Sequence, residues 1–116
     1  MVQVMMQVSE ELAERLRPLS AWLSTVLELS LVGCQTVATA TATEVIQFLS
    51  QNPTPQEILD YHVSERAQER LKRLFTLNAA GMLGDAEQQE LDELQRIEHI
   101  LIMLKAQVAK QLQRQS

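Results

Sequence analysis

The chain has 116 residues, of which 46% are hydrophobic and 3% aromatic, and its formal net charge is −5. This length allows one small domain, or two subdomains, with a modest core. The acidic balance argues against a general nucleic-acid coat protein, which needs many Lys and Arg contacts to phosphate. It does not exclude a dimer that binds DNA through a few well-placed contacts, because the distribution of charge matters more than its sum.

Three features of the chain bear on its location. No apolar run approaches the roughly 18 residues that a membrane span requires, and no signal peptide precedes the first segment. The single cysteine, Cys34, cannot form an internal disulfide, and we expect it to be small buried filler in a reducing compartment. We therefore expect a cytoplasmic protein with no membrane partner.

The first segment alternates between two kinds of side chain. One face holds Val2, Val4, Met6 and Val8, and the other holds Gln3, Met5 and Gln7. A period of two predicts a half-buried strand over residues 2–8. No later segment is typical of a second strand, so the same strand of another copy is the expected partner, which predicts a homodimer. The outer face of such a two-stranded ribbon could enter a DNA major groove.

Two amphipathic segments follow this strand. Ser9 is a natural N-cap for a first helix, which Pro18 limits to about three turns. A second helix is expected from about Leu23 to Gly33. Because this second helix is apolar nearly all round, a dimer interface is the expected place for its burial.

Strand, short helix and second helix, in this order and at these lengths, resemble the ribbon-helix-helix fold of bacterial repressors and antitoxins. The resemblance covers about 33 residues and rests on the alternating residues 2–8, the helix start at Ser9 and the core from Leu27 to Leu31. It implies a mainly α fold in which paired N-terminal strands read DNA. The candidate DNA contacts are Gln3, Met5, Gln7, Ser24 and Thr25, and the candidate dimer core is Val2, Val4, Met6, Val8, Leu27 and Leu31. The alternative is that the strand is an ordinary solvent-facing one and that Ser24 and Thr25 are helix caps.

The middle of the chain, residues 34–52, contains an Ala/Thr-rich stretch that either connects flexibly or continues the second helix. Thr41 and Glu44 have capping-box spacing and predict a short helix from Ala42 to Ser50. We divide the chain into a dimerisation and DNA-binding segment (1–33), this connector with its short helix (34–52), and a helical hairpin (53–116).

The hairpin has clear boundaries. Thr54, Pro55 and Glu57 form a capping box with proline at the first helical position. Ser64 caps a helix through about Ala80, and Gly81, Gly84 and Asp85 separate it from a long helix that reaches about residue 113. The short connection predicts antiparallel neighbours.

Residues 53–59, 63–71 and 94–106 also resemble a set of uncharacterised small bacterial helical proteins, some of them antitoxin-like. This resemblance implies a binding protein with a toxin-like protein partner. Arg66, Arg70 and Arg73 are the candidate partner-binding residues. The alternative is a solvated, salt-bridged face, because Glu65 and Glu69 lie directly beside these arginines in the sequence.

No spacing typical of catalysis occurs in the chain. His62 and His99 are the only histidines, and neither has neighbours in sequence that would complete a metal site. We expect a non-enzymatic protein without metal or cofactor. The leading hypothesis is a dimeric DNA-binding regulator or antitoxin-like protein, and the alternative is an interaction or assembly factor that binds no nucleic acid.

Overall fold

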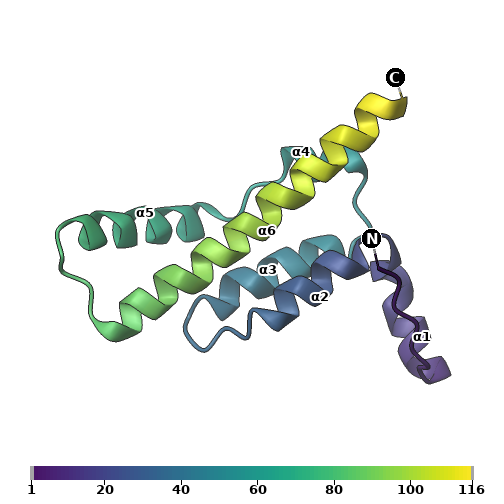
Figure 1. Ribbon diagram of the computed structural model, residues 1–116, viewed down its shortest axis with the longest axis horizontal. Helices are drawn as coiled ribbons and strands as arrows, with labels where there is room; N and C mark the ends of the chain where they lie inside the picture. Colours follow the sequence, from purple (N-terminus) through teal and green to yellow (C-terminus); the bar gives the residue numbers. More distant parts are fainter. Residues whose placement is uncertain (1, 116) are drawn as a thin grey trace.

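Helices account for all the regular structure that is seen in residues 2–115, the part of the chain described by the computed structural model (Figure 1). The elements are α1 (Glu10–Leu16), the 3-10 helix η1 (Arg17–Trp22), α2 (Leu23–Leu31), α3 (Thr39–Leu49), α4 (Pro55–Asp60), α5 (Glu65–Ala79) and α6 (Asp85–Gln115). The long helix α6 contacts α2, α3, α4 and α5 and is therefore the scaffold of the molecule. In Figure 1, α2 and α3 lie on one side of α6 and α5 on the other.

One apolar cluster joins these helices. Its buried members include Val26 and Leu29 of α2, Val45 and Leu49 of α3, Ile58 of α4, Leu74 of α5, and Leu91, Leu94, Ile97, Leu104 and Val108 of α6. With the partly buried Leu101, the α6 residues recur at intervals of three and four, which places them on one stripe of the helix. The same spacing is visible in the sequence, and the structure shows that these residues are buried together.

Helix starts follow the capping signals of the sequence closely. The Ser9 hydroxyl accepts a hydrogen bond from the backbone N–H of Leu12 at 3.1 Å. Thr54 and Glu57 form the reciprocal capping box, with distances of 3.2 and 3.0 Å. The Ser64 hydroxyl caps α5. The expected boundaries of α1, α4 and α5 are therefore confirmed at their N-terminal ends.

The N-terminal strand is not formed, so the prediction of a ribbon-helix-helix fold is wrong. Residues 2–8 have no regular secondary structure, and residues 2–115 contain no strand of any kind. Alternation of side chains creates an extended segment with an apolar face, but a strand also needs a neighbouring backbone to bond with. All other secondary structure here is helical and its backbone groups are already paired, so this chain offers none. The mainly α part of the prediction is correct.

The connector is more helical than its capping signal indicated. Helix α3 begins at Thr39, three residues before Ala42, and Thr41 lies inside the helix and does not cap it. Helix α2 ends at Leu31, and its C-cap Val32 is followed by Gly33 with a φ of +62°. Of α2, only Thr25, Val26 and Leu29 are buried, so this helix has an open side and is not enclosed all round.

Candidate functional site

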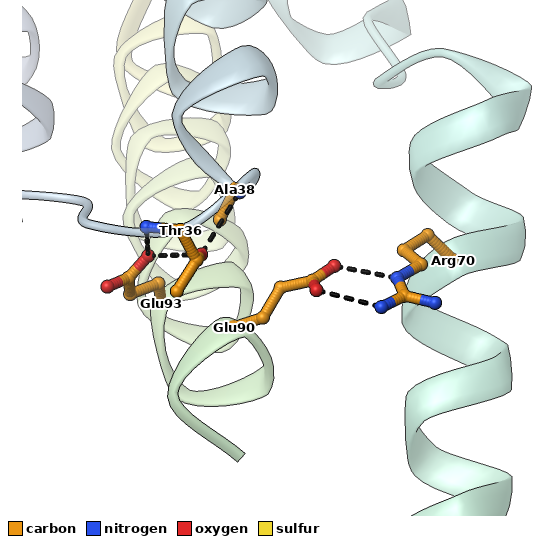
Figure 2. Close-up of polar contacts among 5 residues, drawn as sticks. All are labelled: Thr36, Ala38, Arg70, Glu90 and Glu93. Carbon is orange, nitrogen blue, oxygen red and sulfur yellow. Dashed lines mark hydrogen bonds and ion pairs between the residues drawn. The ribbon is translucent and has the colours of Figure 1, made fainter. Parts of the chain in front are cut away.

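Two buried carboxylates of α6 hold the surrounding segments in place (Figure 2). Glu93 accepts hydrogen bonds from the backbone N–H groups of Gln35 and Thr36, at 3.0 and 3.2 Å, and from the Thr36 hydroxyl at 2.6 Å. The Thr36 hydroxyl in turn accepts from the N–H of Ala38 at 3.1 Å. Glu93 therefore fixes the loop between α2 and α3, and with it the start of α3.

The ionisation of Glu93 reflects this arrangement. Desolvation by itself raises the pKa of the carboxyl group, but hydrogen bonds from Thr36, Gln35 and Gln89 outweigh it and lower the pKa below its usual value. The negative charge also acts on Cys34 nearby. Burial, followed by the Glu93 charge, raises the pKa of the Cys34 thiol above its usual value.

The second carboxylate, Glu90, positions α5. Arg70 donates from Nε and Nη2 to the two carboxylate oxygens at 2.7 and 2.9 Å, in a bidentate ion pair. The Glu90 side chain is 6% exposed and that of Arg70 38% exposed. Since Glu90 is buried, Arg70 is committed to neutralising it.

The segment that leads into α5 is tied to two helices, α3 and α6. The ring of Tyr61 stacks on the ring of Phe48 of α3, with centroids 4.0 Å apart. The backbone carbonyl of Tyr61 accepts a hydrogen bond from the Lys105 ammonium of α6. The backbone N–H of Ser64 donates to Glu44. Burial and the negative charge of Glu44 raise the pKa of Tyr61 to about 12. These contacts hold the N-terminal end of α5 at a fixed place beside α6.

Between α5 and α6 the side chains leave an open groove, which we call the α5–α6 groove. Its volume is about 540 Å³. Its apolar walls include Leu71 and Phe75 of α5 and Leu94, Ile97, Leu101 and Ile102 of α6. Phe75 is 42% exposed and Ile102 56% exposed, so large apolar surfaces face solvent here. Leu74 is the one fully buried residue of α5, which leaves the helix free to offer the rest of its apolar face to a ligand.

The rim of the groove is more basic than the rest of the protein. Lys72 and Lys105 line it, with His62 at one end and Glu98 as its one carboxylate. With two basic and seven acidic residues, positions 1–60 carry a net charge of −5, while positions 61–116, with eight of each, carry none. No acidic residue follows Glu98 in the chain. The groove therefore combines an apolar floor with a cationic edge in an otherwise acidic protein.

The predicted partner-binding arginines lie on the other side of α5. Arg66, Arg70 and Arg73 line a separate hollow of about 900 Å³, next to α3 and α6. Glu44, Glu69 and Glu90 share this hollow, which makes it a mixed-charge surface. Arg70 is held by Glu90, whereas Arg66 and Arg73 are exposed.

The predicted DNA contacts and dimer core are placed as follows. Gln3, Met5 and Gln7 are exposed in the extended segment, Ser24 is exposed in the first turn of α2, and Thr25 is buried there. Val2, Val4, Met6, Val8, Leu27 and Leu31 are all exposed in the single chain. The structure brings none of these into one site, and their assignment to a dimer core stays a prediction.

Sequence reasoning missed both Glu90 and Glu93. Each is a carboxylate that borders the apolar stripe formed by Leu91, Leu94 and Ile97. An acidic residue at such a position is a usable signal, because a buried charge needs a partner. The groove itself was also missed, since it depends on the spacing between two helices.

Two further findings concern residues 2–115 alone. No three His, Cys, Asp or Glu side chains gather there in a way that could hold a metal ion. None of the helices in that range is both long and apolar enough to span a membrane. Comparisons with protein-family models, curated proteins and solved structures found no match for the chain.

Proposed function

We propose that this chain is a non-enzymatic regulator that acts by holding a partner protein in the α5–α6 groove. The observation that carries this proposal is the pair of solvent-facing walls, Phe75 on α5 and Ile102 on α6, on either side of a cavity of about 540 Å³. Exposed apolar surface rimmed by polar groups is typical of an interaction site. The fold supports it further, because the Arg70–Glu90 ion pair and the contact of Lys105 with the Tyr61 carbonyl hold α5 at a fixed position beside α6.

The groove also defines the chemistry of the partner. Two neighbouring helices with an apolar floor between them suit an amphipathic helix, whose residues at i, i+3, i+4 and i+7 enter the floor. Lys72 and Lys105 at the rim favour carboxylates on the flanks of that helix. The expected partner segment is therefore apolar on one side and acidic at its edges.

An antitoxin-like protein is one form that such a regulator takes, since it blocks another protein by binding it. The proposal keeps the assignment of partner binding to the C-terminal helices and moves it from the arginine face of α5 to the groove. It includes no DNA-reading ribbon, because the strand on which the ribbon depended is not formed.

The test uses a fluorescent 18-residue amphipathic peptide with leucines on one face and glutamates at its edges, and a twin with lysines in place of the glutamates. Fluorescence anisotropy should show tighter binding of the acidic peptide. Ile102→Ser should weaken it about tenfold, because burial of an isoleucine contributes about 1.5 kcal/mol or more. Met103→Ser is the matched control, since Met103 neighbours Ile102 and is 55% exposed but does not line the groove.

The result that contradicts the proposal is equal binding of the two peptides, or equal losses in the Ile102 and Met103 variants. Absence of saturable binding by the acidic peptide would contradict it as well. Circular dichroism of each variant checks that the fold is retained.

A further inference from the structure

The N-terminal arm, residues 2–16, has no residue buried against the rest of its own chain. Every residue from 2 to 15 is exposed, and α1 has no buried residue. Val4 is 84% exposed and Leu12 42% exposed. Helix α1 contacts η1, the element that follows it in the chain. A run of apolar side chains this exposed marks an interaction surface.

The arm has the chemistry that the α5–α6 groove requires. Leu12 and Leu16 are four residues apart and so share one face of α1. Glu10, Glu11 and Glu14 lie on the other side of the same helix, Glu14 pairs with Arg17 at 2.7 Å, and Arg15 is the one basic residue of α1. The helix is acidic overall and has one apolar face, which complements an apolar floor with lysines at its rim.

The arm cannot reach the α5–α6 groove of its own chain. Figure 1 shows α1 and α5 at opposite sides of the molecule, in a view down its shortest axis. Helix α1 continues directly into η1, which is anchored where Trp22 donates from Nε1 to the carbonyl of Pro53 at 3.2 Å. Leu19 of η1 also packs on the core. The occupant must therefore come from another molecule.

We propose that the arm of one copy occupies the α5–α6 groove of a second copy, and that the exchange is reciprocal. This inference rests on the proposed function, because it fills the groove through which that function acts. Reciprocal exchange closes a two-fold dimer and so uses each contact twice. The arm then competes with an outside partner, and partner binding is coupled to opening of the dimer.

The test measures mass by sedimentation equilibrium of the full chain, in three forms. The wild type should dimerise, and high salt should weaken the dimer because the rim contacts are exposed charges. An arm variant with Glu10→Lys, Glu11→Lys and Glu14→Lys should dimerise about a hundredfold more weakly, since three charges are reversed on each of the two arms that face the groove lysines. A groove variant with Phe75→Ser and Ile102→Ser should also be monomeric, whereas Met103→Ser should not.

Mixing the two defective variants gives the decisive measurement. The intact arm of the groove variant fits the intact groove of the arm variant, so the mixture should form a heterodimer although neither variant dimerises alone. A wild type that stays monomeric at every concentration overturns the exchange. A wild-type dimer whose two variants fail to complement each other also overturns it, because an arm-to-arm or α2-to-α2 interface gives that result.

The acidic peptide separates this inference from the proposed function. The arm variant presents an unoccupied groove, so it should bind the peptide more tightly than the wild type does. If the wild type is monomeric and the peptide still binds in an Ile102-dependent way, the exchange is wrong and the proposed function stands. If the peptide fails to bind even to the arm variant, the proposed function is wrong.

Discussion

Replacement of Glu93 should lower the free energy of unfolding more than replacement of any other charged residue of α6. Four hydrogen bonds end on its carboxylate, from the N–H groups of Gln35 and Thr36, the Thr36 hydroxyl and the Gln89 amide. Hydrogen bonds to a charged group contribute about 1.5–3 kcal/mol each, but bonds that share one acceptor are not additive. We expect Glu93→Ala to lower the free energy of unfolding by about 3 kcal/mol, and Glu93→Gln by about half of that.

Urea denaturation followed by circular dichroism measures this loss, and the melting temperature should fall by about 10 °C in Glu93→Ala. Asp92→Asn is the matched control, because Asp92 directly precedes Glu93 in α6 and is exposed. Its one described hydrogen bond is the one it accepts from the Gln88 amide. A lowered carboxyl pKa contributes stability that is complete above the usual value of 4.5 and is lost as the pH falls below it. The difference in the free energy of unfolding between the wild type and Glu93→Gln should therefore become smaller as the pH falls below 4.5. A Glu93→Ala variant as stable as Asp92→Asn would refute the reasoning.

Other contacts give three further expectations. Arg70→Met leaves the buried Glu90 carboxylate unpaired and should lower the free energy of unfolding by about 2 kcal/mol, a value reduced for the partial exposure of the arginine. In urea titrations, the double variant Arg70→Met with Glu90→Met should regain much of this lost stability. Thr54→Ala removes the hydroxyl of the capping box and should lower the free energy of unfolding by about 1 kcal/mol, and an unchanged urea midpoint would contradict that. Because burial and the Glu93 charge raise the pKa of Cys34, iodoacetamide should alkylate it at pH 8.5 more slowly than a free cysteine, and an equal rate would show that the thiol is unperturbed.

Local signals in the sequence predicted the helices whose starts depend on local contacts. Ser9, Thr54 and Ser64 each cap a helix within three residues of themselves, so the sequence contains the whole interaction. The long apolar stripe of α6 was predictable for the same reason, since its spacing repeats over many turns. The mainly helical fold follows from these features.

The start of α3 and the form of residues 2–8 depend on distant contacts. The capping-box spacing of Thr41 and Glu44 predicted a later helix start, but Glu93, more than fifty residues away, fixes the loop at Thr36 and lets α3 begin at Thr39. Glu44 is used elsewhere, as the acceptor for Ser64. The alternation of Val2 to Val8 specifies an extended segment with an apolar face, and it cannot specify whether a second backbone pairs with it.

The site was only partly predictable. That the C-terminal helices bind a partner stays a prediction, and of the arginines of α5 that it singled out, Arg70 is paired with a buried glutamate. The groove depends on how far α5 stands from α6, and this distance is set by contacts of Tyr61, Ser64 and Arg70 with α3 and α6. No pattern within α5 or α6 alone contains that information.

The central claim is that the α5–α6 groove receives an acidic amphipathic segment. A titration of the isotope-labelled, full-length arm variant with the acidic peptide, followed by two-dimensional NMR, tests it most directly. The account predicts saturable shifts at groove residues such as Leu71, Thr76 and Ile102, with little change at Met103 or along α2. Saturable shifts confined to the arginine face of α5 or to α2, or no saturable shifts anywhere, would contradict it.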